Sequence, residues 1–583
     1  MRATLQKRGF WRNLAFFVLP LLPVIYLLSL VAKYGVNVPY ADEFTLAPLL
    51  VKAHEHTINF SDLFRQHNEH RYFFPRLLFI AFAYFSHGDV RAEMFFSALL
   101  AGFTAITLWV VIRRTITGSI EKALALAFLV NLLLFSPVQA ENWVWGFQFV
   151  LLLCNFLFAC GLLVAISSLN VWKKYVLCAV LAIVSTFSFG GGVLLWALTF
   201  PIALSFEPAQ QFKRSACWLF AWVALGTAVL CLYFVGFRHP AQVPGVAVGL
   251  LDYYLYVTTF VGAHLWRADR TEAILPAALI GTVLLALYGA AALYLLRYVR
   301  DSSLRKRMIP WLTIGAYAFL SACLAAVARI GFGVNQGLDS RYTSFSLYLS
   351  VAAIGLVAIV ANEIRLRPRN KMSTEGLARV ETGLLTGFIL LTLVAFSWGQ
   401  SLMAQSQRTR LWGKGALLFS NVLDDGTIHD KYLMAEASQA RMFANMEDSI
   451  GLFHPSMLRS AEISKLNTES KLVGYLDYLT VEGQTCKFVG WATLPKRDRP
   501  ADCVVLSYET PGQGNAIAFR VADETQERLD VARALHSTTL TACGWICHFD
   551  RSLVPPGDHL IRAWAFDAKR ATLYPLDTPI ILH

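Results

Sequence analysis

Long runs of apolar residues, separated by short polar gaps, fill the chain from about residue 13 to residue 398. A run of about 20 apolar residues is long enough to cross a bilayer as a helix. The pattern therefore predicts a polytopic α-helical membrane domain over residues 1–400, with about eleven transmembrane helices. The predicted helices cover residues 13–32, 92–112, 123–137, 147–168, 175–189, 192–206, 216–236, 273–296, 309–328, 345–363 and 380–398.

After Trp398 the pattern changes twice. Residues 401–467 are polar with a helical period, which predicts a helical extracytoplasmic connector. In residues 468–583, short β-rich runs alternate with turn signals such as Pro555-Pro556-Gly557. Strands at this spacing are typical of a β-sandwich. We therefore expect a membrane domain, a connector and a β-sandwich.

Composition and charge place the chain in the membrane class. Of its 583 residues, 56% are hydrophobic and 15% are charged, whereas soluble domains have about 25% charged residues. The net charge of +12 comes from clusters such as Arg113-Arg114 and Lys173-Lys174, which lie in short gaps between apolar runs. This is the positive-inside pattern. The basicity therefore indicates topology, with the N-terminus inside and the C-terminal domain outside, and no nucleic-acid partner.

The basic N-terminus, followed by an apolar run, has the layout of a signal peptide. The run over residues 13–32 is long enough to span a membrane, however, and no small-residue cleavage site follows it. We expect an uncleaved first helix. Of the ten cysteines, six lie in apolar spans and are expected to be small core residues. The other four could form one or two disulfides of undetermined connectivity if their segment is outside: Cys486, Cys503, Cys543 and Cys547.

The first outer loop, residues 34–91, carries an acidic pair and two short predicted surface helices, over residues 42–56 and 73–85. Ionisable groups beside a bilayer are candidates for function. Asp42 and Glu43 could act as a general base or as metal ligands. The alternative is a helix cap, because acids favour the first turn of a helix.

A dense polar run ends the same loop, with His67, Glu69, His70 and Arg71 within five residues. The two histidines could share a helix face and bind a divalent metal ion, although no zinc-protease spacing is present. Arg71 could hold a phosphate, since a guanidinium matches phosphate geometry. The alternative is a polar rim that keeps a helix at the membrane surface.

Two later outer loops supply the remaining candidate substrate-binding residues. Glu141, Asn142 and Gln148 flank two tryptophans, an arrangement that suits a sugar site, although tryptophans also anchor helices at membrane boundaries. Arg341 and Tyr342 precede the tenth predicted helix, where Arg341 could bind a phosphate or serve as an interfacial cation. The sequence has no phosphate-binding P-loop and no dinucleotide fingerprint. An outward-facing site would therefore need a pre-activated donor carried by the membrane.

The layout resembles the GT-C superfamily of integral-membrane glycosyltransferases, in its protein mannosyltransferase and aminoarabinose transferase branches. The resemblance rests on a basic N-terminus, one span, and a long loop with the acidic pair Asp42-Glu43 and with Pro75, followed by the stretch from Gly88 to Arg91 and a span that ends at Arg113-Arg114. It implies a polyprenyl-phosphate sugar donor and a catalytic acid at Asp42, with Glu43 as the alternate. The C-terminal segment resembles accessory carbohydrate-binding domains. The chain departs from the pattern at Phe73-Phe-Pro75-Arg76, where those branches show a Lys-Pro-Pro-like element, so the acceptor class does not transfer.

The sequence thus predicts a glycosyltransferase in a bacterial inner (cytoplasmic) membrane, in contact with membrane lipids. It would transfer a sugar to a cell-surface glycan or a lipid-linked acceptor on the outer face. The alternative is a lipid-linked glycan transporter or a non-catalytic scaffold of cell-envelope assembly. A transporter would concentrate broken helices and polar residues at the midplane, whereas here only the Gly190–Gly192 break has that character. A third option is an acyl- or phosphoryl-transferase with an outward site.

Overall fold

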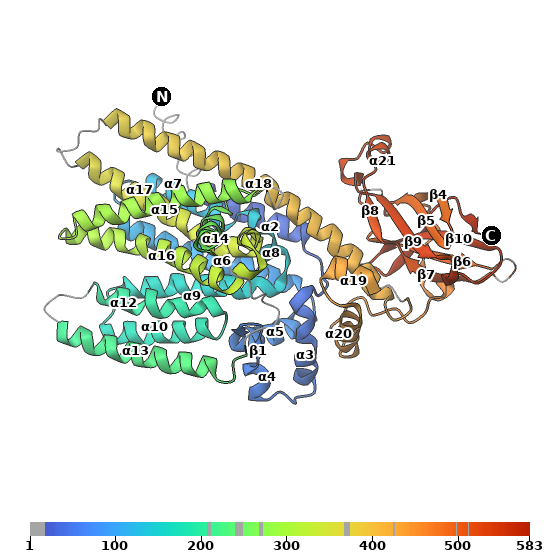
Figure 1. The fold of residues 1–583 in the computed structure, drawn as a ribbon, viewed down its shortest axis with the longest axis horizontal. Coiled ribbons are helices and arrows are strands. Elements are labelled where there is room, and N and C mark those ends of the chain that lie inside the picture. The colour runs from blue at the N-terminus through green and yellow to red at the C-terminus, as the bar shows by residue number, and fades with distance from the viewer. Residues whose placement is uncertain are drawn as a thin grey trace, which may run out of the picture. The chain divides into compact units, whose positions relative to one another are not determined.

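The chain forms two compact units in this computed structural model. The structure describes residues 18–582 except 207–211, 239–248, 268–271, 367–373, 424–425, 497, 511 and 513. Unit 1 comprises Met1–Gly35, Asn59–Leu78 and Ala92–Ala404, and unit 2 comprises Val36–Ile58, Phe79–Arg91 and Gln405–His583. Unit 1 is mainly helical, with one small two-stranded hairpin, and unit 2 contains the large sheets (Figure 1). The basic N-terminal residues that set the predicted topology, Arg2 to Arg12, lie outside the described residues.

The described part of the chain has eight helical segments that are long and apolar enough to cross a membrane, as expected of a multi-pass membrane protein. The predicted number, about eleven, is not reached by this criterion, because three predicted spans form shorter described helices: α2 (Leu22–Tyr34), α10 (Val171–Thr186) and the broken segment from η5 (Gly190–Leu194) to α12 (Phe200–Leu204). The eight segments are Arg91–Thr115, Ile120–Val144, Gly146–Ala165, Ser215–Phe234, Ile274–Arg297, Ser302–Phe332, Ser340–Leu366 and Ala378–Phe419.

The helices of unit 1 pack in two groups. In the first, α9 (Phe149–Ala165) contacts α10 and α12, and α10 also contacts α13 (Phe212–Phe234) (Figure 1). The second group has α14 to α17 as its members. Their bounds are Leu250–Gly262, Ile274–Arg297, Ser302–Arg329 and Thr343–Leu366.

Helix α14 corrects the sequence analysis, which assigned residues 238–272 to an outer loop. The segment is a helix because it packs closely on α15. A Cβ atom on Gly262 would lie 1.9 Å from the carbonyl oxygen of Ala277, and one on Gly281 would lie 1.9 Å from that of Thr258. Only glycine at both positions allows the two backbones to approach this closely. A hydropathy pattern does not reveal such a contact.

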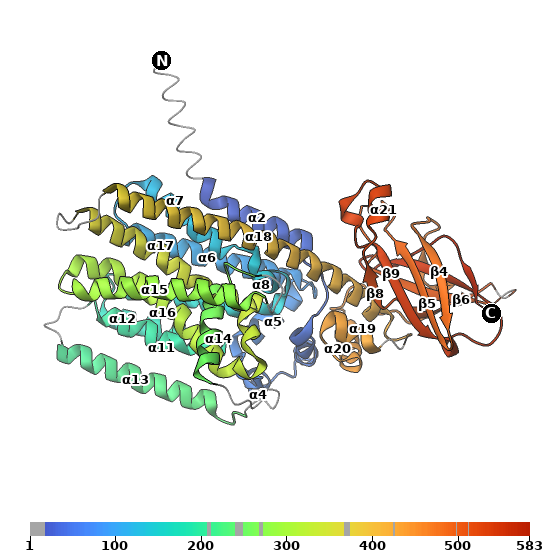
Figure 2. The same cartoon turned by 45° about the horizontal axis from the view of Figure 1, so that its top comes forward.

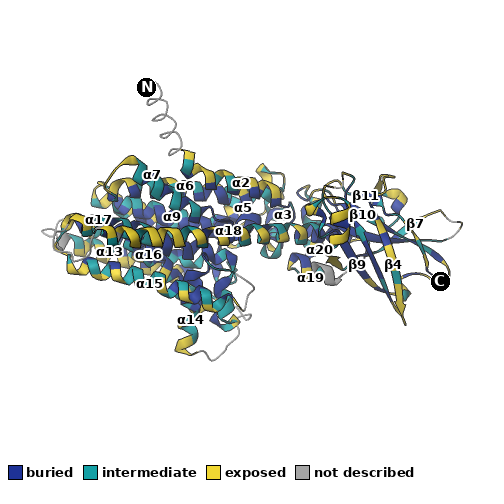
Figure 3. Cartoon of the chain, turned by 90° about the horizontal axis from the view of Figure 1, so that it is seen from above, coloured by how far each residue is buried: buried dark blue, intermediate teal, exposed yellow. Residues whose placement is uncertain are grey.

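Helix α18 (Thr374–Phe419) is 46 residues long and continues past Trp398, where the sequence predicted a separate connector. The first part of the predicted connector is therefore an extension of this helix. Along its membrane part, α18 exposes Leu384, Leu385, Leu390 and Leu393, each by 43% or more (Figure 3). An apolar surface of this kind suits contact with lipid chains.

The C-terminal region is rich in strands, as predicted. Two sheets have the strand orders β3-β11-β10-β6-β7, with β12 also on β10, and β4-β5-β9-β8 (Figure 2). Phe488 and Trp545 of the smaller sheet share one hydrophobic core with Val505 and Ala565 of the larger. The strands are β3 (Asn467–Thr468), β4 (Gly474–Glu482), β5 (Thr485–Ala492), β6 (Cys503–Glu509), β7 (Ala516–Val521), β8 (Glu524–Gln526), β9 (Gly544–Asp550), β10 (His559–Asp567), β11 (Thr572–Pro575) and β12 (Ile580–Leu582).

The four cysteines of this region are buried and form no disulfide. Cys486, Cys503 and Cys547 belong to the shared core, and Cys543 packs in a small cluster with Val531 and Leu540. They therefore behave as small apolar residues, like the cysteines that the sequence places in the spans.

Part of the first loop belongs to unit 2. Its helix α3 (Ala47–His54) packs against α20 (Ala437–Ser449). Two carboxylates are buried there: Glu43 accepts a hydrogen bond of 2.8 Å from the Tyr40 amide, and Glu447 lies on α20. Burial, aided by the charge of Glu43, raises the pKa of Glu447 to about 8. Glu447 is therefore protonated in the folded protein at neutral pH.

This shifted pKa predicts how stability depends on pH. Folded Glu447 keeps its proton up to about pH 8, whereas its ordinary pKa is 4.5. Its contribution to the free energy of unfolding is therefore full below pH 4.5 and is lost as the pH rises toward 8. We expect Glu447→Gln to flatten the fall of the melting temperature between pH 5 and 8, a window set by these two pKa values. Glu55→Gln, at an exposed position of the same unit, should keep the wild-type slope; equal slopes for wild type and Glu447→Gln would contradict the assignment.

Candidate functional site

The polar run of the first loop forms a small hairpin in unit 1. Strand β1 (Gln66–His67) pairs with β2 (His70–Arg71), and His67 lies opposite His70. Asn68 makes the turn with φ +48°, a conformation that Asn tolerates better than most residues. The two histidines therefore come together across a hairpin, not along a helix face as the sequence analysis expected.

The hairpin brings Glu69 to the end of helix α16, where its carboxylate pairs with Arg329. The His70 Nε2 atom lies 3.6 Å from the same carboxylate oxygen. On its other side, the His70 ring accepts a hydrogen bond of 3.1 Å at Nδ1 from the Gly190 amide. The second Glu69 oxygen is buried and accepts no hydrogen bond from the described residues. The Glu69 carboxylate thus links the first loop to α16, and His70 links the same loop to the glycine break.

Arg71, predicted to bind phosphate, has a different setting. Its guanidinium donates to the backbone carbonyl oxygens of Phe64, Tyr233 and Val235, and it lies 4.6 Å from the centre of the Phe64 ring. The side chain is buried. These contacts favour a role in holding the hairpin against the end of α13.

A second acidic group comes from α8 (Ala140–Val144), the short helix that precedes α9. Glu141 accepts hydrogen bonds from the Ser340 hydroxyl, at 2.7 Å, and from the Arg341 amide, at 3.0 Å. The Asn142 side chain donates to the Arg341 carbonyl oxygen at 3.0 Å. The Arg341 guanidinium itself pairs with Asp339 at 3.0 Å. These hydrogen bonds hold the two segments together. They also fix the backbone of Arg341, from which its guanidinium group extends.

Tyr342 connects the Glu69–Arg329 ion pair with the group of residues around Arg341. Its phenol interacts electrostatically with Arg341, Arg329 and Asp339, and also with Glu69. Tyr256 of α14 interacts with both arginines as well. Arg329 and Arg341 therefore belong to one cluster of charges, which we call the arginine cluster: Glu69, Arg329, Asp339, Arg341 and Tyr342.

The remaining predicted residues of unit 1, His67 and Gln148, pack inside the protein. The His67 ring packs against Phe147 and Tyr72, with ring centres 5.7 and 5.3 Å apart. Gln148 is buried directly before α9. The structure brings Glu69 and His70 together, and it brings Glu141 and Asn142 onto Arg341.

The predicted catalytic pair belongs to unit 2. Glu43 is buried and bonded to the Tyr40 amide, the arrangement of a carboxylate that caps the first turn of a helix. Asp42 is half-buried, and its carbonyl oxygen accepts a hydrogen bond from Thr45. The cap that the sequence analysis considered for Asp42 is thus made by its neighbour. The catalytic role of Asp42 stays a prediction.

Sequence reasoning gave Arg329, Asp339 and Tyr256 little or no weight. Arg329 ends a long apolar run and reads there as an interfacial cation, and Tyr256 lies in a stretch assigned to a loop. One signal was available in the sequence: an arginine stands at each end of the polar loop over residues 329–341. Its partner Glu69 could not be identified without the fold.

Within the described residues, no group of three His, Cys, Asp or Glu side chains is placed to hold a metal ion. Comparisons with protein-family models, with curated proteins and with solved structures find no match to this chain. The site therefore has to be interpreted from its own geometry.

The contact between His70 and the glycine break gives a mutational test. A Cβ atom on Gly190 would lie 2.9 Å from the Nδ1 atom of His70, whereas one on Gly191 would meet only the Phe189 ring at 3.4 Å. We expect Gly190→Ala to displace His70 and to cost about 1–3 kcal/mol in unfolding free energy. Gly191→Ala should stay within about 0.5 kcal/mol of wild type.

Two measurements check this: the melting temperature in detergent, and hydrogen exchange of the hairpin over residues 66–71. Faster exchange in Gly190→Ala alone is the expected result. Equal effects of the two substitutions would show that His70 does not depend on this contact.

Proposed function

We propose that this protein is a membrane glycosyltransferase that uses a polyprenyl-phosphate sugar as donor. The observation that carries the proposal is the arginine cluster, in which Arg329 at the end of α16 and Arg341 just before α17 both interact electrostatically with the Tyr342 phenol. Arginine is the side chain best matched to a phosphate. A leaving phosphate develops negative charge, and stabilising such charge is often the largest catalytic contribution.

A lipid-facing groove in unit 1 supports the proposal. It has a volume of about 670 Å³ and runs between α7 (Ile120–Leu134), α15, α17 and α18. Its walls are mostly aliphatic, with residues such as Leu129, Val283 and Leu391; the lining also includes Lys122, Ser350, Arg365 and Glu381. A groove of this character suits a polyprenyl chain.

The groove begins close to the arginine cluster along the same helix. Ser350, one of its lining residues, lies about 10 Å along α17 from Thr343, at 1.5 Å per residue. Ser350 is held by a hydrogen bond of 2.7 Å with His264. A lipid chain in the groove would therefore direct its phosphate toward Arg341.

The chemistry that we propose is an inverting transfer. The acceptor hydroxyl oxygen attacks the anomeric carbon, and the bond from that carbon to the phosphate oxygen breaks. The polyprenyl phosphate leaves with the electron pair beside Arg329 and Arg341. A carboxylate takes the hydroxyl proton; Asp42 is the predicted base, and Glu69, with its buried second oxygen, is the alternative that unit 1 offers.

The remaining parts complete the proposal. The two C-terminal sheets would form a β-sandwich that binds the acceptor glycan on the outer face of a bacterial inner membrane. The rival is a lipid-linked glycan transporter, which the glycine break at Gly190 would suit. At that break, however, the Gly190 amide is hydrogen-bonded to His70. The charged residues of unit 1 described above also lie near helix ends. Both observations favour the enzyme.

Transfer of radiolabelled sugar from polyprenyl-phosphate donors to membrane glycan tests the enzyme directly. We expect wild type to transfer label, and Arg341→Gln to lower kcat by about 10²–10³-fold through loss of charge stabilisation. Asp42→Ala should abolish transfer without loss of folded protein. Lys173→Gln, an exposed change, should match wild type.

The base is assigned by comparing Asp42→Ala with Glu69→Gln. Loss of transfer in Glu69→Gln alone would move the base to the arginine cluster. If verified folded wild type transfers label from none of the donors, the transporter or scaffold becomes the better explanation.

The groove makes a separate prediction about chain length. Ala353→Trp places a large ring in the groove, so we expect the KM for long-chain polyprenyl donors to rise about tenfold or more, with a smaller effect for a short-chain donor. Val327→Trp, at a position 74% exposed on α16, is the control. An equal rise in KM for both chain lengths would argue against the groove as the lipid site.

A further inference from the structure

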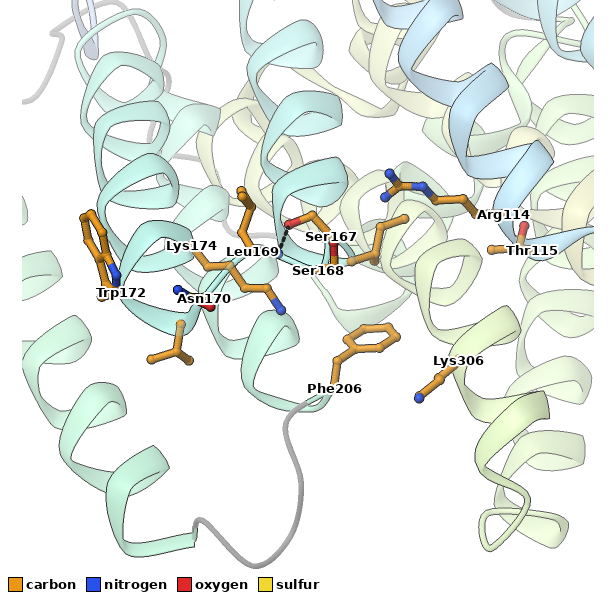
Figure 4. A pocket seen from close by; sticks show the side chains of 12 residues that line it. Arg114, Thr115, Ser167, Ser168, Leu169, Asn170, Trp172, Lys174, Phe206 and Lys306 are labelled. Carbon is orange, nitrogen blue, oxygen red and sulfur yellow. Dashed lines mark hydrogen bonds between the residues drawn. The ribbon is translucent and has the colours of Figure 1, made fainter.

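Unit 1 contains a second cavity, which the proposed transfer reaction does not use. It has a volume of about 640 Å³ and is lined by residues at the ends of several helices (Figure 4). We call it the basic pocket. Its lining residues are Arg114, Thr115, Ile166, Ser167, Ser168, Leu169, Asn170, Val171, Trp172, Lys174, Phe206 and Lys306.

Three cationic side chains from three different helices line this one cavity. Arg114 comes from the last turn of α6 (Arg91–Thr115), Lys174 from the first turn of α10, and Lys306 from the start of α16 (Figure 4). Among the described residues, the lining includes no Asp or Glu. Lys174 is only 3% exposed. Like charges gathered in one concave site create a field that attracts an anion.

Neutral polar side chains complete the lining, although the Ser167 hydroxyl already donates to the Val164 carbonyl oxygen. Ser167, Ser168 and Asn170 supply hydroxyl and amide groups. Asn170 precedes α10 without capping it through its side chain. The first turn of this helix, with Val171 and Trp172, lies at the pocket edge, where backbone amides can bind an anion. These amides add to the attraction that the three cations exert on an anion.

Membrane topology alone does not explain the arrangement. The positive-inside pattern accounts for basic residues at this end of the helices, but it does not require them to face a shared cavity. Their sequence neighbours show the difference: Arg113 lies 5.8 Å from the Trp109 ring centre, and Lys173 lies 5.6 Å from that of Trp172. Neither residue lines the pocket.

The pocket is separate from the arginine cluster. Lys306 and Arg329 lie at opposite ends of α16, 23 residues apart, which corresponds to roughly 35 Å along the helix. By the distribution of basic residues, the pocket end faces the cytoplasm. Basic pockets between helices on that side are suited to anionic headgroups.

We propose that the basic pocket binds a phosphate-bearing anion on the cytoplasmic side, either the headgroup of an anionic phospholipid or a soluble phosphate. The phosphate would be held by Arg114, Lys174 and Lys306, with the Ser168 hydroxyl as a neutral donor. Occupancy would join α6, α10 and α16 through one ligand. The site would thus stabilise the helix bundle and does not depend on the proposed transferase activity.

The test uses the purified full chain and native mass spectrometry. Wild type is titrated with phosphatidylglycerol and, separately, with phosphatidylcholine. The key variant is Arg114→Gln/Lys306→Gln, which changes two exposed residues of the pocket. The matched control is Arg113→Gln/Arg305→Gln, which removes the same charge from the same helix ends but not from the pocket.

We expect wild type to bind phosphatidylglycerol in preference to phosphatidylcholine. Removal of two pocket cations should weaken that binding about 30-fold, given roughly a tenfold effect or less for each cation. The control should stay within about threefold of wild type. Equal weakening in both double variants would show diffuse surface charge and overturn the proposal, as would unchanged binding in the pocket variant.

Inorganic phosphate distinguishes the two sources. If it displaces phosphatidylglycerol and raises the melting temperature of wild type but not of the pocket variant, a soluble phosphate suffices. If it has neither effect while the lipid preference depends on Arg114 and Lys306, the ligand is a lipid headgroup. Lys174→Gln should weaken lipid binding further. Because the Lys174 side chain is buried, the melting temperature of this variant without ligand is measured as well.

Discussion

The ion pair between Glu69 and Arg329 is the contact on which the architecture of unit 1 most depends. A carboxylate and a guanidinium beside a bilayer are costly unless each is paired. Their pairing requires the hairpin at residues 66–71 to reach the end of α16. Once it is there, His70 meets the Gly190 amide, and Arg71 meets the carbonyl oxygens of Tyr233 and Val235.

The same constraint explains why the charged residues occur as connected groups. Glu141 is bonded to Ser340 and to the Arg341 amide, and Arg341 in turn pairs with Asp339. Half-satisfied buried polar networks are costly. The Arg341 guanidinium is thus held in place by contacts within the protein, as the proposed role in charge stabilisation requires.

The aliphatic groove and the basic pocket of unit 1 differ in their chemistry. The groove between α7, α15, α17 and α18 is aliphatic along most of its length, whereas the basic pocket gathers cations and hydroxyl groups. One suits a hydrocarbon chain and the other an anion. A membrane protein with both could handle a lipid substrate at one end of its helices and respond to an anionic phosphate at the other.

The sequence by itself determined the membrane class, the position of most spans and the strand-rich C-terminal region. These features follow from local hydropathy and from turn residues, which need no distant partner. It also marked Glu69, Glu141 and Arg341 as candidates, since ionisable residues in outer loops stand out against apolar runs. It placed α14 in a loop and separated α18 from its extension, because helix length there depends on packing.

Only the tertiary structure decided which of these residues meet. Glu69 and Arg329 are 260 positions apart, and Glu141 and Ser340 are 199 apart. No local pattern encodes such pairs. The hairpin around Asn68 places His67 and His70 on paired strands, whereas the sequence analysis considered a shared helix face. Arg71, a predicted phosphate ligand, instead donates hydrogen bonds to backbone carbonyl oxygens. The reason is physical: a charged side chain at a membrane boundary is defined by the partner that the fold supplies, and the chain sequence specifies that partner only through the complete fold.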